Sequence, residues 1–316
     1  MYQIGIDIGG TSIKAGLVSD GRIISWKSVP TDTDAGADKI IGDIAQMVNA
    51  LKDDAGDKII TGVGIGCPGA VNSCTGMVDH AYNLKWDYVP LGERMQKLTG
   101  YPTRVCNDAN AAALGEAKYG AGKAYQNSVF ITIGTGIGSG IIIDGRLYEG
   151  NQSKGAEIGH VVIKSGGEPC TCGRRGCFEA YSSATALIRD TTRAMLKDPD
   201  SKLWTVCPDI DKVNGKTVFD AMLMDDKTAQ GVFDNYIRML GEGLVNIINA
   251  LRPEAIILGG GVCAQGDVLL VPLKKYIAKY AFGEGPHVGL HIASLKNDAG
   301  IIGAAAVSYT HLRAHE

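Results

Sequence analysis

The segment YQIGIDIGGTSIKAGLVSDGRIISWKSV, residues 2–29, indicates the fold more directly than any other part of the chain. Three strand-like runs, 2–7, 13–18 and 22–29, are separated by short turns that contain glycine. Two hairpin-linked strands after the first predict an antiparallel meander. They argue against the strand–helix–strand unit that opens a dinucleotide-binding fold.

The same order of elements returns in the middle of the chain. Strand-like residues 128–133 are followed by the turn Gly134-Thr135-Gly136, and residues 137–143 and 146–148 continue as two further strands. A strand–turn–strand–turn–strand arrangement that occurs twice indicates an internal duplication.

Apolar periodicity predicts the remaining helices and buried strands. The expected helices are residues 40–51, 109–119, 233–251 and the small-residue segment 299–307, and the expected buried strands are 61–67, 255–258 and a run ending at Val105. The polar stretch 197–216 contains Pro199, Pro208 and Gly215, and it predicts a surface excursion.

The domain organisation follows from length and from these patterns. A chain of 316 residues with 45% hydrophobic residues suits two lobes. We expect a small α/β lobe at residues 1–107, completed by a C-terminal helix at about 297–307, and a large α/β lobe at 108–296. Residues 308–316 break the helical pattern abruptly. They are either a native terminus or a remnant of cloning or assembly, and we interpret them as a non-native remnant.

Charge and cysteine usage limit the classes of protein to consider. The net charge of −3 and the isoelectric point near 6.1 favour neither nucleic acid nor a membrane surface as a partner. No apolar run is long enough to span a bilayer, and Met1–Gly5 enters the first strand without a signal peptide. Three of the eight cysteines crowd into residues 170–177, unlike a disulfide framework. We therefore expect a protein of the reducing cytoplasm.

Three glycine turns that follow strands are candidates for nucleotide binding. They are Gly9-Gly10-Thr11, Gly134-Thr135-Gly136 and Gly259-Gly260-Gly261. Glycine lets backbone N–H groups approach a phosphate closely. One such turn alone would be read as an ordinary hairpin, but three on apolar strands favour a nucleotide. The Gly-Lys-Ser/Thr ending of a P-loop is missing.

Two aspartates follow strands and offer carboxylates for phosphoryl transfer. Asp7 ends the first strand and could organise Mg²⁺ through waters, or it could only cap a turn. Lys14 could contact phosphate or lie in solvent. Asp108 begins a helix, where an N-cap is the simplest interpretation. Phosphoryl transfer to a hydroxyl also needs a carboxylate that orients the hydroxyl and accepts its proton.

The strongest chemical signal is a cluster of one histidine and three cysteines. His160, Cys170, Cys172 and Cys177 make a Cys₃His set that suits a tetrahedral, structural Zn²⁺. A redox pair or buried thiols are the alternative, and the combination with histidine argues against it. Glu157 and Glu179 flank the cluster, where a rigid metal site would hold them to bind sugar hydroxyls. Otherwise they are surface charges.

Together these residues resemble the ROK family of repressors, uncharacterised frames and sugar kinases. The motifs occur in the family's order from about Tyr2 to Val307. They are Asp7-Ile8-Gly9-Gly10-Thr11, Cys67-Pro68-Gly69, Asn107-Asp108-Ala109-Asn110-Ala111-Ala112, Gly134-Thr135-Gly136-Ile137-Gly138, Glu157-x-Gly159-His160, the cysteine cluster and Leu258-Gly259-Gly260-Gly261-Val262. Within the family, residues 176–187 and Asn83 are similar to those of bacterial glucokinases.

The resemblance implies a fold and a set of roles. The fold is the α/β, duplicated, actin-like ATPase (ribonuclease H-like) fold, with two lobes that close around a sugar in the cleft between them. Asp108 is implied as the general base. The implied sugar contacts are Asn83, Asn107, Asp108, Glu157, His160 and Glu179. The nucleotide set is Asp7, Gly9, Gly10, Thr11, Lys14, Gly134, Thr135, Gly136, Gly259, Gly260 and Gly261. Ser12 stands where many members carry lysine, and Lys14 is the residue that compensates.

The implied reaction is glucose plus ATP to glucose 6-phosphate plus ADP, with Mg²⁺, in a homodimer or homotetramer. Kinases for allose, N-acetylmannosamine, N-acetylglucosamine or fructose are alternatives, because one or two hydrogen bonds decide the sugar. A sugar-sensing repressor is disfavoured, because family repressors carry an N-terminal helix-turn-helix module and this chain begins at the first kinase strand. A non-catalytic, zinc-stabilised sugar-binding protein is the third hypothesis.

Overall fold

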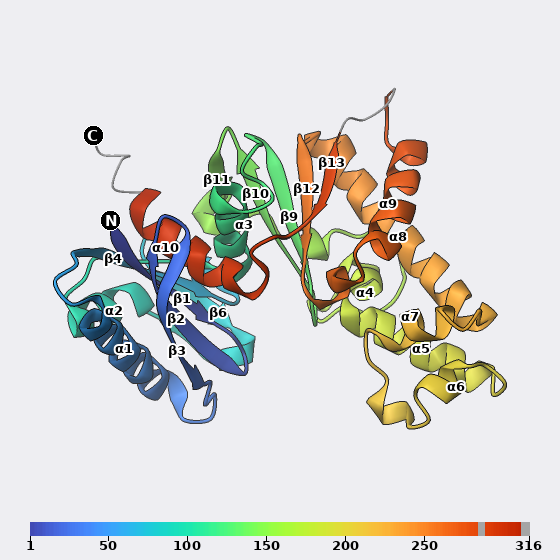
Figure 1. Cartoon of the computed structure of the whole chain (residues 1–316), viewed down its shortest axis with the longest axis horizontal. Coiled ribbons are helices and arrows are strands. Elements are labelled where there is room, and N and C mark those ends of the chain that lie inside the picture. Colours follow the sequence, from blue (N-terminus) through green and yellow to red (C-terminus); the bar gives the residue numbers. More distant parts are fainter. Residues whose placement is uncertain (284–287, 311–316) are drawn as a thin grey trace. The chain divides into compact units, whose positions relative to one another are not determined.

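Two five-stranded sheets with the same strand order form the framework of the computed structural model, which describes residues 1–283 and 288–310 (Figure 1). The order is β3-β2-β1-β4-β8 in one sheet and β11-β10-β9-β12-β13 in the other. In each sheet, a meander of three consecutive strands is extended by two later strands. This repetition confirms the predicted duplication.

The first sheet begins with the predicted meander. Its strands are β1 (Tyr2–Ile8), β2 (Ser12–Ser19), β3 (Arg22–Pro30), β4 (Ile60–Cys67) and β8 (Thr103–Asn107). β1, β2 and β3 pair antiparallel, β4 runs parallel to β1, and β8 runs parallel to β4. A small sheet that the sequence patterns did not predict follows β4. It contains β5 (Ala70–Asn72), β6 (Met77–Ala81) and β7 (Trp86–Val89), with the 3₁₀ turn η1 (Tyr82–Leu84) between the last two.

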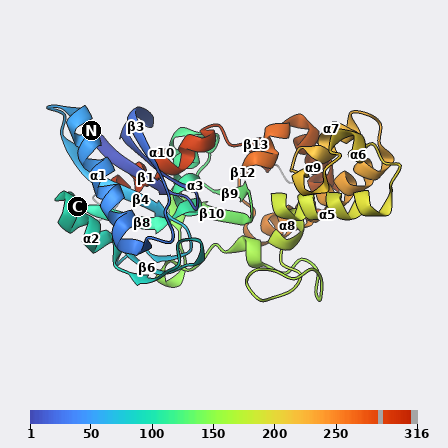
Figure 2. The same cartoon turned by 90° about the horizontal axis from the view of Figure 1, so that it is seen from below.

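Alternation along β1 decides which helix covers each face of the first sheet. Ile4, Ile6 and Ile8 belong to one buried core with apolar residues of α1 (Gly36–Ala55). Gly5 points to the other face, where an added Cβ would lie 1.9 Å from the Ile301 carbonyl oxygen of α10 (Ala299–Thr310). The helix therefore packs directly on strand backbone, and it lies along β1 in both views (Figures 1 and 2). α2 (Leu91–Thr99) and α3 (Asp108–Tyr119) complete the helices around this sheet.

Two glycines allow α3 and α10 to cross at close range. An added Cβ on Gly303 would lie 1.7 Å from the Ala111 carbonyl oxygen, and one on Gly115 would lie 2.6 Å from the Ala299 carbonyl oxygen. Both contacts are with backbone of the facing helix, so side-chain rearrangement cannot relieve them. The small residues of 299–307, noted in the sequence, are thus explained by packing.

We expect Gly303→Ala to lower the free energy of unfolding by about 2–3 kcal/mol, because overpacking forces the helices apart. The sign of this change distinguishes the two cases, because replacing glycine by alanine inside a helix with free space around the site normally raises the free energy of unfolding by about 1 kcal/mol. Gly42→Ala in α1 is the matched control, since nothing lies within 4 Å of its added Cβ. Urea unfolding of both variants measures the effect. A stabilised Gly303→Ala would show that the two helices do not cross this closely.

The second sheet contains β9 (Ser128–Ile133), β10 (Ile137–Ile143), β11 (Arg146–Tyr148), β12 (Ala255–Gly259) and β13 (Gly289–Ile292). The helices between β11 and β13 in the chain are α4 (Glu179–Ser182), α5 (Ala184–Lys197), α6 (Leu203–Val206), α7 (Thr217–Met222), α8 (Lys227–Leu251) and α9 (Asp267–Tyr280). The predicted helix 233–251 is α8, which begins earlier because the Asp226 side chain caps it at Ala229 N–H. The shorter 3₁₀ turns are η2 (Asn151–Ser153), η3 (Ile158–His160), η4 (Ile210–Lys212), η5 (Gly261–Gln265) and η6 (Lys296–Asp298).

Residue contacts divide the chain into two units. The first comprises residues 1–130, 139–156 and 293–316, and the second comprises 131–138 and 157–292. The predicted lobes, 1–107 and 108–296, divide the chain at different places, and their boundaries stay a prediction. The segment that includes α10 belongs to the first unit, although it is the last in sequence. The predicted remnant begins at Ser308, which is buried in α10, and residues 311–316 lie outside the described part.

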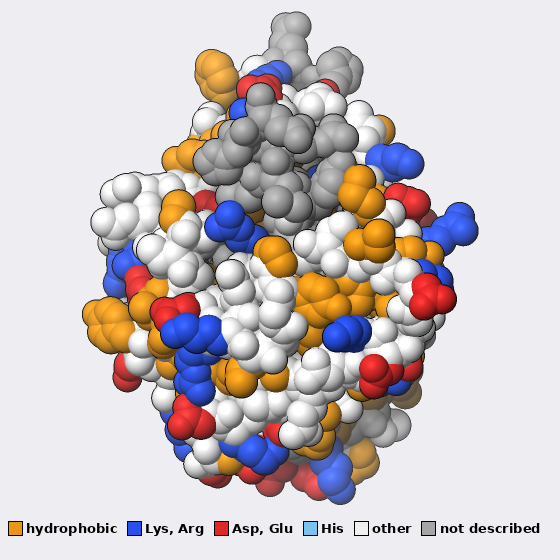
Figure 3. Space-filling model, turned by 90° about the vertical axis from the view of Figure 1, so that its left-hand side faces the viewer, with side chains coloured by type: hydrophobic (Ala, Val, Ile, Leu, Met, Phe, Trp, Pro, Cys, Tyr) orange, Lys and Arg blue, Asp and Glu red, His pale blue; other side chains and the backbone are white. Residues whose placement is uncertain are grey.

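The stretch 197–216 is not purely the surface excursion that the sequence predicted. Leu203, Cys207 and Val213 are buried, and they hold this stretch to the second unit. Basic and acidic side chains lie interspersed on the face that Figure 3 shows. Over residues 1–283 and 288–310, no helix has the length and apolar character needed to cross a bilayer.

Candidate active site

In the first unit, predicted site residues lie at the carboxyl ends of the parallel strands β1, β4 and β8. Asp7 pairs with Gly66 across β1 and β4, and Asn107 is the last residue of β8. Asp108 follows directly, and its Cα lies 3.5 Å from where a Cβ on Gly66 would be. This edge of a parallel sheet is the usual place for ligands in α/β proteins.

The turn after β1 is held to the next segment of the same unit. Thr31 donates its hydroxyl to the Gly9 carbonyl oxygen at 2.7 Å, and the Thr31 N–H donates to the Thr11 carbonyl oxygen at 3.0 Å. Asn83, the predicted sugar contact in η1, lies beside this turn, since its Cβ is 3.9 Å from an added Cβ on Gly10. Thr31 is a positioning residue that the sequence patterns did not reveal.

The helix cap at α3 separates the roles of Asn107 and Asp108. The Asn107 side-chain oxygen accepts the N–H groups of Ala109 and Asn110 at 2.9 and 3.2 Å, so Asn107 is the N-cap. Its amide donates to the Gly69 carbonyl oxygen at 3.1 Å. Asp108 is therefore not the N-cap considered from sequence, although one carboxylate oxygen accepts the Ala109 N–H at 2.9 Å. Burial raises the pKa of Asp108, and this hydrogen bond opposes the rise.

Asp7 lies between opposing influences. Gly300, near the start of α10, lies directly against its carboxyl group, since an added Cβ would be 2.7 Å from the Asp7 carboxyl carbon. Burial and, less strongly, the Asp108 carboxylate raise the pKa of Asp7 to about 6, whereas Lys14 on the paired strand lowers it. An ionised Asp7 is thus costly in the free protein, and a bound cation would relieve that cost.

Asp7→Asn should stabilise the free protein at pH 7.5 by about 1–2 kcal/mol, allowing for partial solvent exposure of the carboxyl group. The folded pKa of about 6 exceeds the ordinary aspartate pKa of 3.8, so the native state binds more protons than the unfolded chain between these values. The stability contribution of Asp7 is therefore complete below pH 3.8 and is lost as pH rises through 6. Urea unfolding without magnesium at pH 4 and 7.5 tests this. An equal difference between variant and parent at both pH values would contradict it.

Two predicted nucleotide turns are neighbours in the second unit. Gly134-Thr135-Gly136 connects β9 to β10, and Gly260 follows β12, the next strand of the sheet. Gly260 has φ 93°, and an added Cβ would lie 2.2 Å from the carbonyl oxygen of Ile133. Only glycine fits this position, so the two turns lie against one another. The Thr185 hydroxyl also donates a hydrogen bond to the Thr135 carbonyl oxygen at 2.8 Å.

The histidine and the three cysteines converge, as their spacing predicts. Their ligand atoms all lie within 4.8 Å of one another. The sulfurs of Cys172 and Cys177 are 3.7 Å apart, and Cys170 Sγ is 3.6 Å from His160 Nδ1. Tetrahedral Zn–S bonds of about 2.3 Å place two sulfurs about 3.8 Å apart, so the residues fit a zinc ion.

Backbone geometry brings these ligands together. Gly176 has φ 88°, and an added Cβ would lie 1.8 Å from the Lys164 carbonyl oxygen. Its N–H donates to the Glu168 carbonyl oxygen, and the Cys170 N–H donates to that of Arg174. The segment 168–176 therefore forms a tight hairpin, which glycine alone permits at position 176.

Glu179 connects the cysteine cluster to the nucleotide turn. One carboxylate oxygen accepts the Ile137 N–H at 2.9 Å, and the other accepts the Thr171 hydroxyl at 3.1 Å. A Cβ on Gly136 would lie 2.2 Å from the carboxylate, so glycine is required beside it. Glu157 directly precedes η3 and is exposed. Within the second unit, the structure thus brings together Glu179, the cysteine cluster and Gly134–Gly136. Asp7, Asn107 and Asp108 form a separate group in the first unit.

Comparison with known proteins extends these observations to the whole chain. Residues 3–310 match the ROK family. The chain belongs to the ROK family. It is 39% identical to a glucokinase of Halalkalibacterium halodurans over 96% of this chain and 93% of the relative. It is also similar to the crystal structure of a ROK family glucokinase from Streptomyces griseus in complex with glucose and AMPPNP, with 35% identity, a TM-score of 0.83, and coverage of 97% of this chain and 99% of that one.

These ROK relatives confirm the predicted actin-like ATPase fold and the predicted family. Regulators of the family are also similar. The xylose repressor of Bacillus subtilis is 28% identical over 98% of this chain but 77% of the repressor. The roles of individual site residues in this chain stay predictions.

Proposed function

We propose that the protein is a phosphotransferase that transfers the γ-phosphoryl group of ATP to the 6-hydroxyl of a hexose, with glucose as substrate. The observation that carries this proposal is Asp108, a carboxylate with raised pKa at the carboxyl end of β8, in a chain 39% identical to a glucokinase over nearly its full length. A general base works best when its pKa approaches the operating pH. Burial moves the pKa of Asp108 in that direction.

In this mechanism Asp108 orients the 6-hydroxyl and takes its proton. The hydroxyl oxygen forms a bond to the γ-phosphorus while the bond from that phosphorus to the ADP oxygen breaks, and the proton on Asp108 then returns to solvent. Asn107, fixed as the N-cap, and Asn83, beside the glycine turn, are proposed to bind other hydroxyls. Glu157, His160 and Glu179 are the proposed sugar contacts of the second unit.

The nucleotide is proposed to lie on the glycine turns. Gly134, Thr135 and Gly136 with Gly259, Gly260 and Gly261 provide adjacent turns with little side-chain bulk. Gly9, Gly10, Thr11 and Lys14 are proposed to contact phosphate from the first unit. Asp7 is proposed to organise Mg²⁺, which neutralises phosphate charge.

Zinc is proposed to be structural, held by His160, Cys170, Cys172 and Cys177. Four protein ligands leave no open coordination position, so the ion would order the segment that supports Glu179. All eight cysteines are free in the structure, and thiolate ligands need reduced cysteines, so we propose a cytoplasmic protein. A homodimer or homotetramer is proposed from the family resemblance, and light scattering tests it.

An ADP-release assay with Mg-ATP across hexoses and N-acetylhexosamines tests the function. A profile dominated by glucose supports it. A profile led by allose, fructose, N-acetylmannosamine or N-acetylglucosamine would keep the mechanism and change the substrate. Absence of ADP release with every sugar, from folded and zinc-loaded protein, would contradict a kinase and favour a non-catalytic sugar-binding regulator.

A further inference from the structure

A wide cavity of about 450 Å³, open to solvent, lies in the second unit, apart from every residue proposed above for sugar, nucleotide or zinc. Its walls are α5, α8, Tyr181 of α4 and the segment that contains Lys164 and Glu168. Small-molecule sites in proteins usually enclose roughly 300–1,000 Å³. The cavity is therefore large enough for a metabolite of the size of a sugar phosphate.

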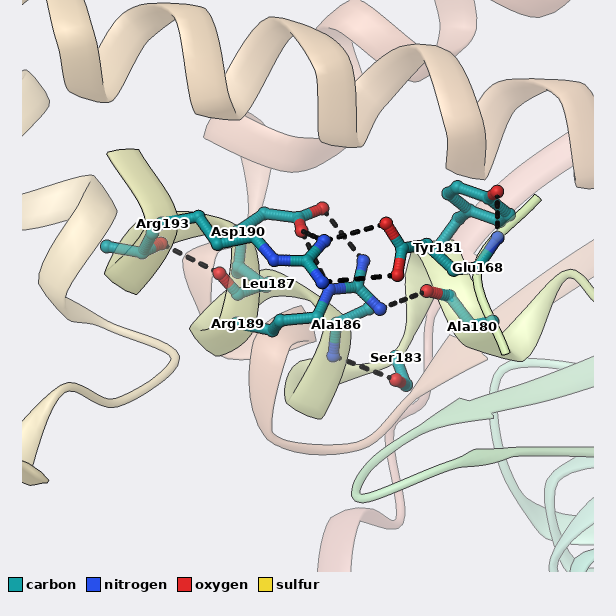
Figure 4. Close-up of polar contacts among 10 residues, drawn as sticks. Glu168, Ala180, Tyr181, Ser183, Ala186, Leu187, Arg189, Asp190 and Arg193 are labelled. Atoms are coloured by element: carbon teal, nitrogen blue, oxygen red, sulfur yellow. Dashed lines mark hydrogen bonds and ion pairs between the residues drawn. The ribbon is translucent and has the colours of Figure 1, made fainter. Parts of the chain in front are cut away.

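One wall is a network of two arginines and two carboxylates (Figure 4). Arg193 donates to both oxygens of Glu168 at 2.7 and 3.3 Å, and Arg189 donates to both oxygens of Asp190 at 2.8 and 3.0 Å. Arg189 also donates to the Ala180 carbonyl oxygen at 2.8 Å. The Arg193 hydrogen bond lowers the pKa of Glu168, so this wall is balanced in charge at neutral pH.

Three further cations line the cavity without an acidic partner in its lining. They are Lys164, Lys197 and Arg238. The Lys164 ammonium lies 5.8 Å from the centroid of the Tyr181 ring, and Arg238 donates to the Asn235 side-chain oxygen at 2.7 Å. Neither contact neutralises a charge, so the lining as a whole is positive. Ammonium and guanidinium groups gathered around one hollow are the usual means of binding a phosphoryl group.

We propose that this cavity binds a small organic phosphate, with its phosphoryl group held by Lys164, Lys197 and Arg238. An inorganic phosphate ion shares that chemistry but fills only a small part of the volume. The remaining wall offers the Asn235 amide for a hydroxyl and the apolar surface of Val232 and Met239 for a carbon skeleton. A phosphorylated sugar has both features.

The cavity is connected to the proposed hexose site through Tyr181. Its hydroxyl accepts the Glu168 N–H at 2.6 Å, which joins α4 to the hairpin that carries the cysteines. Glu179 begins α4, two residues before Tyr181, and Cys170 lies two residues after Glu168. A ligand against Tyr181 and Glu168 therefore changes hexose affinity. This coupling rests on the proposed function, whereas the phosphate site itself does not.

Calorimetric titration tests the site at low salt, with the protein saturated with glucose so that the hexose site is occupied. The probes are glucose 6-phosphate and inorganic phosphate. The variant Lys197→Gln/Arg238→Gln removes two exposed cations and leaves the arginine–carboxylate wall intact. Lys274→Gln/Lys275→Gln, on the exposed side of α9, is the matched control with the same change in charge.

We expect glucose 6-phosphate to bind the parent and the control with equal affinity. The affinity of the cavity variant should fall about tenfold or more, because it loses two charge-assisted contacts. Weaker binding of inorganic phosphate supports an organic ligand, and equal binding would reduce the proposal to a phosphate ion site. Unchanged affinity in the cavity variant, or no binding of either probe to the parent, would overturn it. Because no turnover is measured, a failed kinase assay does not affect this result.

Coupling is measured as the dissociation constant for glucose with and without a saturating sugar phosphate that carries no free 6-hydroxyl. Linkage requires that the factor by which the phosphate changes glucose affinity also applies in the opposite direction. We expect a change of about fivefold or more in the parent and no change in the cavity variant. An equal change in both proteins would mean that the phosphate acts elsewhere.

Discussion

Asp108→Asn should lower kcat by about 10³-fold or more and leave the dissociation constant for glucose within about tenfold. Asparagine keeps the shape of the side chain and its contact with the Ala109 N–H, but it accepts no proton. The helix is unaffected, because Asn107 and not Asp108 is its cap. The loss therefore falls on the chemical step.

Single-turnover kinetics and calorimetric glucose binding separate these effects. Asp267→Asn is the matched control, because Asp267 is the first residue of α9, as Asp108 is of α3, and is exposed. The control should retain parent kcat. A kcat for Asp108→Asn within tenfold of the parent would show that another group accepts the proton. A loss of glucose affinity with little change in kcat would make Asp108 chiefly a binding residue.

Cys172→Ser should release zinc and lower the melting temperature by about 10 °C or more, because structural zinc contributes several kcal/mol or more to folding. Cys172 is exposed, so replacement of its sulfur would cost little in a protein without metal. A large effect at this position is therefore a signature of a metal ligand. Bound zinc measured by atomic absorption, together with thermal unfolding, gives the answer.

The matched control is Cys74→Ser, which alters another exposed, free cysteine away from the cluster. It should retain zinc and melting temperature. Loss of zinc should also raise the KM for glucose, because the Thr171 hydroxyl that holds Glu179 lies between two of the ligands. Unchanged metal content in Cys172→Ser would remove the proposed zinc site.

Spacing alone predicted the features that depend on neighbouring residues. The meander followed from apolar runs broken by glycine turns, and its repetition near residue 128 predicted the second sheet. The ligands of the cysteine cluster also lie close in sequence, so their convergence needed only a tight hairpin. The small sheet β5–β7 was missed, because its strands are short and carry little alternation.

Only the tertiary structure decided which side chains share a function. The sequence made Asp108 the candidate for the cap, but the structure gives that place to Asn107, whose backbone is extended and whose side chain accepts the N–H groups of Ala109 and Asn110. The hydrogen bond from Ile137 to Glu179 joins residues far apart in sequence.

The sequence by itself therefore determined the two meanders, the glycine turns and the ligand cluster, which local backbone preferences dictate. The approach of α10 to β1, the environment of Asp108 and the positive cavity between α5 and α8 came only from tertiary structure. The physical reason is that close packing and charge are set by atoms that meet in space, and a local pattern carries no information about distant segments.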